Sequence, residues 1–425
     1  MIFAILLLLI VLIFAGMPIA FAIGSVAWLY MAASDVPLII LAQRIATGPD
    51  SWVLLAMPLF VLAGLLMNDT GISKGILRLA EALIGHLRGG LAMVNVLASM
   101  LFGGVSGSAV ADTAALGSVL IPGMTKRGYK PEVSAAITSS SASIGIVIPP
   151  SIPMILYGAI TSVSVGTLFI AGLIPGLLIG LSQILVIAVL ARRNDWGAVH
   201  RFSWRALAEA AWQGVPGLMM PLIIIGGILS GVFTPTEAGG VAVVYGLAVS
   251  VLFYRGLTFA VLYRALVKAG VLTAVVMLII STSYAFGWVM AHEQIPQAIA
   301  NWISGFALSE TGFLIITALI LIAMGAILHG DPLLLIMVPI LYPTVIALGV
   351  DPLHFGIIMV FCVAIGQQSP PVGSTLFVVS AIAKRDIFAI SRANIPFVLA
   401  LVSVLLAVIL VPEITFLLPE WSGLR

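Results

Sequence analysis

The sequence predicts an all-α membrane protein that crosses the bilayer many times and consists of two repeats in opposite orientations. Three observations point to this fold class: an extreme apolar composition, a pattern of Gly and Pro residues that recurs 221 positions later, and an uneven distribution of basic residues. Each repeat is expected to carry a re-entrant helical hairpin and a helix that is broken within the membrane.

The composition excludes an ordinary soluble protein. Of the 425 residues, 62% are hydrophobic and only 8% are charged, and the mean hydropathy is +1.25. A soluble domain carries roughly 25% charged residues. The net charge of +2 gives no basic surface for a nucleic acid. The only cysteine, Cys362, excludes an internal disulfide and a multi-cysteine metal site.

The Gly and Pro residues indicate a duplicated fold. When the chain is shifted by 221 residues, these residues fall on one another without a gap over a long stretch. Because Gly and Pro mark backbone positions that other residues fill with difficulty, such a match indicates a structural repeat. The matched pairs are Gly104 and Gly325, Pro122 and Pro343, Gly128 and Gly349, Pro131 and Pro352, Gly145 and Gly366, Pro149–Pro150 and Pro370–Pro371, and Pro175 and Pro396.

The first repeat is assigned to residues 1–212. Its hairpin halves are too short for comfortable spans, and non-helical backbone is tolerated at membrane depth only when it is buried or lines a wet cavity. Its arm helix has apolar residues at helical spacing, which is typical of a helix at an interface. The predicted elements are scaffold spans within 1–67 (Met1–Ala15, Pro18–Ala33 and Ser51–Met67), an arm helix 71–88, a hairpin 90–124, a broken helix 131–162 and a span 167–191.

The second repeat, residues 213–425, is expected to follow the same order. Its first two spans are joined at Phe233–Glu237, where Glu237 follows a proline turn and is interpreted as structural. The predicted elements are scaffold spans 217–254, a span 269–290, an arm 293–306, a hairpin 310–347, a broken helix 352–383 and a span 394–418.

The basic residues set the orientation of both repeats. If the arm helix at 71–88 is cytoplasmic, alternating spans place all but Arg44 and Arg425 of the 18 Lys and Arg residues in the cytoplasm. This satisfies the positive-inside rule. The first hairpin then enters the membrane from the cytoplasm and the second from the opposite side. Both termini are expected outside.

Inverted repeats with interrupted helices near the bilayer midplane are the architecture of secondary transporters. Carbonyl and hydroxyl oxygens of unwound turns suit Na⁺, and helix N-termini suit a carboxylate. We expect a cation site formed by Ser106, Ser108 and backbone oxygens of Gly145–Ser151. The matching site would use Gly325–Ile327 and Gly366–Val372.

The substrate is expected between the two hairpin tips. No Lys or Arg lies between Lys130 and Arg192, or between Lys268 and Lys384. An anionic substrate would therefore be held by dipoles, hydroxyl groups and bound cations. The residues expected to contact it are Ser108, Ser143, Ser151, Ser369, Ser374 and Thr375.

Several residues have a second interpretation. Serines in membrane helices often bond to their own helix. Asp112 is a candidate for ion binding because acids within the membrane are often functional, but it could also be a structural cap, since Leu333 stands at the matching position. Asp331 near the second hairpin tip is likewise a candidate supporting residue for a site, but it could also be the N-cap of a helix that starts at Pro332. No catalytic signature is present, so an enzyme is not expected.

A family resemblance follows from the segments MPIAFAIG, MPLFVLAG, GGVSGSAVADTAALG, SSSASIGIVIPPS, FTPTEAG and GQQSPPVGS. Together they resemble the large membrane subunit of tripartite ATP-independent periplasmic (TRAP) transporters, the DctM-like family, over essentially the whole chain. The resemblance implies an elevator-type fold of the ion-transporter superfamily in the bacterial inner membrane. It also implies uptake of an organic anion, such as a C4-dicarboxylate or sialic acid, coupled to two or more Na⁺ ions without an organic cofactor.

The resemblance further implies two partners, a small four-helix membrane subunit and a periplasmic substrate-binding protein. The sodium ligands that it implies are Gly104, Ser106, Ser108, Gly145, Ile148, Gly325, Gly366, Ser369 and Val372.

Two alternatives remain open. The first is a stand-alone Na⁺- or H⁺-coupled carboxylate carrier of the same superfamily, and the absence of neighbouring genes for the two partners would favour it. The second is a channel or a structural membrane protein, and a channel would conduct without saturation or ion coupling.

Overall fold

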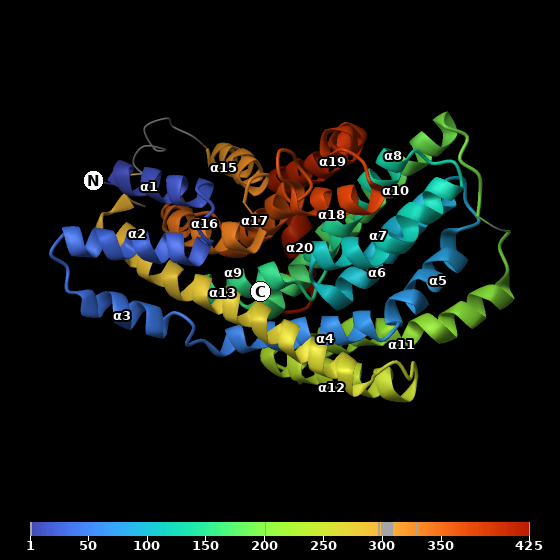
Figure 1. The fold of residues 1–425 in the computed structure, drawn as a ribbon, viewed down its shortest axis with the longest axis horizontal. Coiled ribbons are helices and arrows are strands. Elements are labelled where there is room, and N and C mark those ends of the chain that lie inside the picture. The colour runs from blue at the N-terminus through green and yellow to red at the C-terminus, as the bar shows by residue number, and fades with distance from the viewer. Residues whose placement is uncertain (1, 200, 296–297, 299–308, 329, 425) are drawn as a thin grey trace.

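The computed structural model describes residues 2–424 except 200, 296–297, 299–308 and 329. Within these residues the chain is helical and contains no β-strand (Figure 1). This confirms the all-α fold class. By length and composition, seven of the described helical segments could cross a membrane: Trp52–Asp69, Val165–Arg193, Trp204–Leu229, Pro235–Leu252, Phe259–His292, Gly330–Ala347 and Ile387–Leu410. Most of the arm expected at 293–306 lies outside the described residues.

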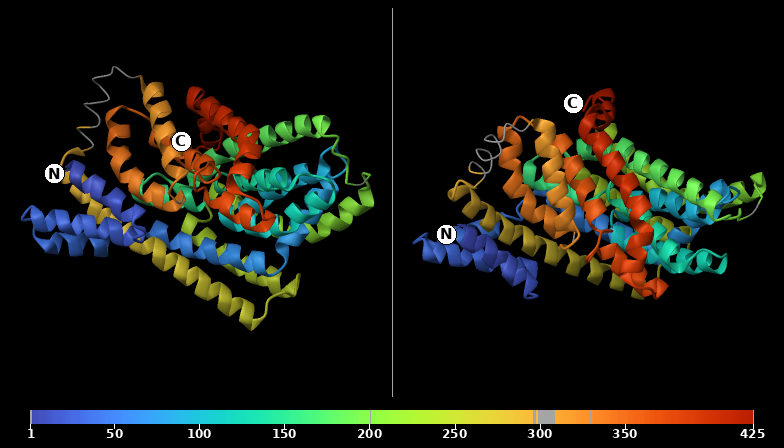
Figure 2. Two further views of the ribbon diagram at one scale, coloured as in Figure 1. Left: turned by 45° about the horizontal axis from the view of Figure 1, so that its top comes forward. Right: turned by 90° about the horizontal axis from the view of Figure 1, so that it is seen from above.

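One group of helices, here called the scaffold helices, lies along one long side of the molecule (Figures 1 and 2). Within it, α4 packs against α12, and α13 packs against α2, α3 and α4. The group comprises α1 (Ile2–Phe14), α2 (Ile19–Ala33), α3 (Leu38–Thr47), the short 3-10 helix η1 (Trp52–Leu55), α4 (Ala56–Asp69), α11 (Trp204–Leu229), α12 (Pro235–Leu252) and α13 (Phe259–His292). The amphipathic helix α5 (Ile72–Ile84) packs against α11 and α6.

The hairpins and broken helices form a second group, here called the hairpin bundle. In the first repeat these are α6 (Gly90–Ser106) and α7 (Ala109–Lys126), then α8 (Pro131–Ala142), η2 (Ser143–Ile146) and α9 (Ile152–Thr161), followed by α10 (Val165–Arg193). In the second repeat they are α15 (Glu310–Gly325) and α16 (Gly330–Ala347), then α17 (Pro352–Gly366) and α18 (Ser374–Ala383), followed by α19 (Ile387–Leu410) and α20 (Glu413–Trp421).

The structure bears out the 221-residue repeat. Helices α7 and α16 begin at Ala109 and Gly330, and α8 and α17 begin at Pro131 and Pro352. The glycines between these helices match as well, because Gly128 and Gly349 have φ values of +88° and +74°. A left-handed backbone suits glycine, which has no Cβ to clash. The Pro149–Pro150 and Pro370–Pro371 peptide bonds are both cis.

Each repeat contributes half of its broken helix to the other repeat. Helix α18 packs on α7 and α8, and α9 packs on α16 and α17. Helix α17 lies at the centre, and every residue from Leu353 to Gly366 is buried. A helix that is apolar all round belongs in an interior. The exchange therefore holds both breaks inside the bundle.

Several elements differ from the sequence prediction. Helix α11 begins at Trp204, well before the span expected from 217. Helix α3 occupies a stretch for which no helix was expected. Helix α13 has 34 residues, because Thr258 accepts a bond from Val261 N and caps it well before the predicted start. The final span, predicted at 394–418, is two helices, since Pro412 lacks an N–H and α19 ends at Leu410.

Candidate functional site

The first hairpin tip is held by local hydrogen bonds. The Ser108 hydroxyl caps α7 and accepts a bond from Ala111 N at 3.5 Å. Ser108 N donates to the Ser106 hydroxyl at 3.2 Å. The Ser106 hydroxyl in turn donates to Oδ1 of Asp112. A capping serine satisfies helix N–H groups that otherwise lack partners. The tip therefore presents two hydroxyl groups and one carboxylate in a compact turn.

The tip lies directly against the first break. A Cβ added to Gly103 would lie 2.5 Å from Gly145 Cα, and one added to Gly107 would lie 2.8 Å from Pro150 O. These positions have no room for a side chain. The expected contact between the first tip and its own broken helix is confirmed.

Asp112 occupies the junction between tip and break. Its side chain is fully buried, and a Cβ on Gly145 would lie 2.4 Å from Asp112 Oδ2. Among the residues that the structure describes, Oδ2 has no hydrogen-bond partner. Buried charged groups are usually paired or coordinate a metal ion. This oxygen is therefore the strongest candidate in the first repeat for binding a cation.

The second tip repeats the backbone contact with different side chains. A Cβ on Gly366 would lie 2.7 Å from Gly325 Cα. Val372 N and Gly373 N donate to Ala326 O at 3.1 and 3.2 Å. The Ser369 hydroxyl donates to Ile365 O of its own helix at 2.7 Å. At this tip the structure joins hairpin and break through main-chain atoms.

The two breaks are linked to each other by polar side chains. The hydroxyl groups of Ser139 and Thr375 lie 2.8 Å apart. Gln368 Nε2 donates to the Ser143 hydroxyl at 3.1 Å, and Asn394 Nδ2 donates to Gln368 Oε1 at 3.1 Å. All of these residues are buried. Two of the predicted substrate residues, Ser143 and Thr375, therefore lie in bonds between the repeats.

Sequence reasoning missed the amide side chains. Gln368 connects the two halves through Ser143 and is itself bonded by Asn394. Asn95 binds Thr138 at 2.6 Å and Ser141 at 3.1 Å. The signal that could have found them is a polar residue within an apolar span.

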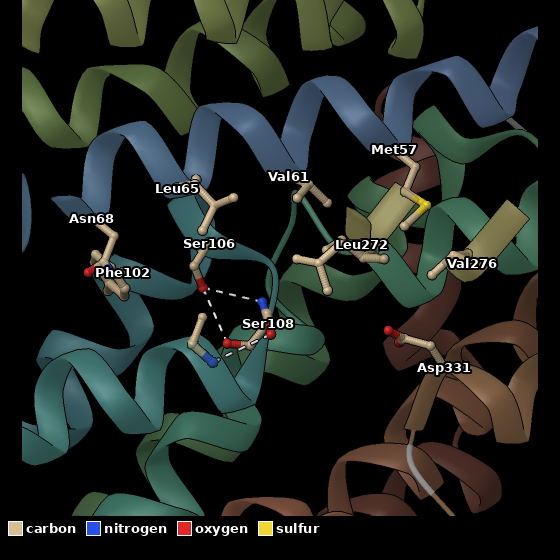
Figure 3. Close-up of a pocket in the computed structure, with 13 residues that line it drawn as sticks. Met57, Val61, Leu65, Asn68, Phe102, Ser106, Ser108, Leu272, Val276 and Asp331 are labelled. Carbon is tan, nitrogen blue, oxygen red and sulfur yellow. Dashed lines mark hydrogen bonds between the residues drawn. The ribbon is translucent and has the colours of Figure 1, made fainter. Parts of the chain in front are cut away.

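A cavity of about 140 Å³, here called the hairpin cavity, separates the first tip from the scaffold helices. Ser106 and Ser108 line it from the first tip, and Asp331 lies across from them at the start of α16 (Figure 3). Helices α4 and α13 form its scaffold wall, for example through Met57 and Val276. Both hairpins thus reach one cavity at the boundary with the scaffold.

The remaining predicted residues are not among those that line this cavity. Ser151 caps α9 and accepts a bond from Met154 N at 3.4 Å. Ile148 packs against Gly176 of α10. Ser369 and Ser374 flank the second break. Of the predicted substrate residues, only Ser108 lines the cavity.

Comparison with known proteins identifies the family. The family model for the tripartite ATP-independent periplasmic transporter, DctM component, matches residues 6–414. The chain belongs to the DctM family of TRAP transporters. The DctM family resemblance predicted from the sequence motifs is confirmed.

Relatives within the DctM family span nearly the whole chain. The C4-dicarboxylate TRAP transporter large permease protein DctM of Pseudomonas aeruginosa is 41% identical over 384 residues, covering 90% of each chain. The sialic acid TRAP transporter large permease protein SiaM of Vibrio cholerae is 37% identical and covers 96% of each chain. The 2,3-diketo-L-gulonate large permease YiaN of Escherichia coli is 36% identical over 96% of each chain.

A solved structure supports the fold of this DctM family member. The YdaH transporter of Alcanivorax borkumensis superposes with a TM-score of 0.62 and 17% identity, covering 90% of this chain and 87% of that one. This likeness concerns the fold alone. The family match and the candidate membrane spans among the described helices make the chain a multi-pass large permease component of a TRAP transporter.

Proposed function

We propose that this large permease imports an organic carboxylate together with Na⁺ ions, by an elevator motion of the hairpin bundle against the scaffold helices. The observation that carries the proposal is the buried Oδ2 of Asp112 beside the Ser106–Ser108 turn, which has no hydrogen-bond partner in the described part of the chain. An acid in this position calls for a compensating cation.

The first repeat offers suitable sodium ligands. Hard cations prefer carboxylate, hydroxyl and carbonyl oxygens. Asp112, Ser106 and Ser108 supply the first two kinds. The backbone of Gly145 lies against Asp112 Oδ2 and, with that of Gly104 in the hairpin, is proposed to supply the third. A sodium ion here would neutralise the carboxylate and bind hairpin and break together. A proton on Asp112 would satisfy the same oxygen, so the coupling ion must be tested directly.

A second sodium site is proposed at the other tip, formed by backbone oxygens of Gly325, Gly366 and Val372 and by the Ser369 hydroxyl. This site would lack a carboxylate at the hairpin position, because Leu333 stands where the first repeat has Asp112. We therefore expect its affinity to be lower than that of the first site.

The substrate class is proposed from the site and the relatives. The relatives' names refer to C4-dicarboxylates, sialic acid and 2,3-diketo-L-gulonate, all of which are organic acids. No Lys or Arg is among the described residues that line the hairpin cavity. A carboxylate bound there would depend on the Ser108 cap, the N-terminus of α7 and the bound cations. Such binding would weaken when the ions leave.

The elevator motion is proposed from the way the two groups of helices meet. Bonds between repeats, such as Ser139 to Thr375 and Ser143 to Gln368, tie the hairpin bundle into one body. The cavity lies at the boundary of this body, against α4 and α13. A rigid bundle that slides along the scaffold would carry this cavity across the membrane.

The partners and orientation are proposed with the same function. A small four-helix membrane subunit would bind the scaffold helices, and a periplasmic substrate-binding protein would deliver the substrate. The chain would reside in the inner membrane with both termini in the periplasm. Cysteine accessibility at each end of the chain tests the orientation.

Reconstituted uptake tests the proposal. The chain, its small subunit and its binding protein would be placed in proteoliposomes with the acid that the binding protein retains. We expect uptake that needs an inward Na⁺ gradient and the binding protein, and that a K⁺ or pH gradient does not replace. Uptake of the free acid without binding protein or Na⁺ would contradict the proposal and favour a stand-alone carrier.

A further inference from the structure

A second cavity lies at the same boundary between the hairpin bundle and the scaffold. It measures about 350 Å³ and is lined by α3 and α13 on one side and by α9 and α16 on the other. Helix α13 lines both cavities, with Val276 at the hairpin cavity and Ser283 at this one. Seven helical residues rise about 10 Å. The second cavity therefore lies roughly two turns further along α13, toward the end that the charge pattern assigns to the outside.

Arg44 gives this cavity a positive charge that the hairpin cavity lacks. It lies on α3, where its side chain is exposed. Its guanidinium makes no hydrogen bond or ion pair with any other residue that the structure describes. None of the described lining residues is acidic. An arginine fork matches a carboxylate in a two-point contact. The guanidinium is thus available to an anion.

A buried hydroxyl that has no partner among the described residues lies at the same cavity. Ser283 lines the cavity and is only 3% exposed. No described group forms a hydrogen bond with its Oγ. Buried polar atoms nearly always have partners, so an unsatisfied one points to a missing ligand or water. Ser283 and Arg44 therefore supply two polar contacts to one cavity.

Aromatic rings form much of the remaining wall. Trp288 and Tyr342 line the cavity. Trp288 stacks on His292 with ring centroids 4.8 Å apart, and Tyr342 donates to Thr161 O at 3.1 Å. These contacts fix the rings in place. A cavity with apolar walls and a few placed polar groups is the usual form of a small-molecule site.

We propose that this cavity is an outer binding site for an organic carboxylate. Arg44 pairs with the carboxylate, Ser283 bonds to one of its oxygens, and Trp288 and Tyr342 contact the carbon skeleton. The inference rests on the proposed function, in which the chain handles organic acids. The site captures the acid outside the hairpin cavity, and the acid passes along α13 when the bundle moves.

The test uses the fluorescence of Trp288, because bromine quenches indole on contact. The purified full-length chain in lipid nanodiscs would be titrated with bromosuccinate and with 4-bromobenzoate, and the saturable quenching would be displaced with unbrominated acid. Trp288→Phe identifies the Trp288 signal. The variants are Arg44→Gln, Arg44→Lys and Ser283→Ala, with Arg193→Gln at the exposed end of α10 as the matched control.

We expect saturable quenching by at least one acid that disappears in Trp288→Phe. Arg44→Gln should weaken binding tenfold or more, and Arg44→Lys and Ser283→Ala should each weaken it several-fold. Arg193→Gln should bind as the original chain does. Absence of saturable quenching with both acids, or unchanged binding in Arg44→Gln, would overturn the proposal.

A phospholipid headgroup could offer a similar anion. Nanodiscs that contain phosphatidylglycerol brominated close to its headgroup test whether the lipid occupies the cavity. If this lipid quenches Trp288 and neither succinate nor benzoate relieves the quenching, the proposal is overturned. Na⁺-driven uptake by the same chain separates the two proposals. Lost quenching with intact Na⁺-driven uptake refutes only the outer site, whereas intact quenching with uptake that ignores Na⁺ refutes only the proposed coupling.

Discussion

The two breaks share one backbone design but differ in their surroundings. In both repeats a glycine of the hairpin meets a glycine of the break, Gly103 with Gly145 and Gly325 with Gly366. The first break is buried and faces the carboxylate of Asp112. The second is partly open, with Val372 40% exposed, and its hairpin has Leu333 at the position matching Asp112. Duplication has thus preserved the turn while the chemistry has diverged.

This difference predicts that the two repeats contribute unequally to ion binding. Under the proposed function, the Asp112 carboxylate would let the first break bind a cation firmly. In the second break, main-chain N–H groups donate to Ala326 O. It also has the amide side chains of Gln367 and Gln368, where the first repeat has Ile146 and Val147. We therefore expect the first repeat to dominate ion binding and the second to respond more to backbone geometry.

Exchanging the side chains at Asp112 and Leu333 should have the largest effect. Asp112→Leu removes the only carboxylate of the first tip and should lower Na⁺-dependent uptake more than a hundredfold. Leu333→Asp places an unpaired charge in an apolar environment, at a cost of order 3 kcal/mol or more. Uptake assays and thermal unfolding of the purified variants measure both effects. An Asp112→Leu variant that retained Na⁺-dependent uptake would remove the distinction between the repeats.

Adding one methyl group at each break should test the shared backbone design. Gly145→Ala and Gly366→Ala both force a Cβ to within 3 Å of neighbouring atoms. Overpacking of this kind costs about 1–3 kcal/mol, so both variants should unfold at lower temperature. Gly240→Ala in α12 has open space around its Cβ and is the matched control. Equal unfolding temperatures for all three variants would show that the glycine contacts are dispensable.

Removing one hydroxyl group in each repeat should give a smaller and unequal effect. Ser106 donates to Asp112, whereas Ser369 donates to Ile365 O of its own helix. A bond to a charged group is worth about 1.5–3 kcal/mol, so Ser106→Ala should raise the Na⁺ concentration for half-maximal uptake about tenfold. Ser369→Ala should change it less than threefold. The reverse order would assign the stronger ion site to the second repeat.

The starts of the two distal half-helices should show the smallest effect. Ser151 caps α9, and its loss should cost about 1 kcal/mol. In the second repeat, α18 follows Gly373 without a side-chain cap, and the Ser374 hydroxyl has no partner among the described residues. Ser374→Ala should therefore change stability by less than about 0.5 kcal/mol. Thermal unfolding of the pair in detergent provides the comparison, and an equal loss would indicate an additional bond at Ser374.

The backbone of this fold could be predicted well because it is specified by Gly and Pro. The match of Pro131 with Pro352 and of Gly128 with Gly349 located the starts of α8 and α17 and the turns before them. The Phe233–Glu237 turn was also predictable, and Glu237 forms a capping box with Thr234 at the start of α12.

The side-chain contacts could be predicted less well. Serines within one short run bind different partners: Ser139 binds Thr375, whereas Ser141 binds Asn95. Such partners lie far away in the chain, and only the exchange of α9 and α18 between the repeats brings some of them together. The second cavity, at Arg44 and Ser283, could not be predicted either. Its walls come from α3, α9, α13 and α16, and α3 itself was not expected.

Calorimetric titration of NaCl into the purified full-length chain in K⁺ buffer measures whether Asp112 forms the stronger cation site. We expect saturable Na⁺ binding whose tighter phase is lost in Asp112→Asn and retained in Ser369→Ala. An Asp112→Asn variant that binds Na⁺ as tightly as the original chain would contradict it.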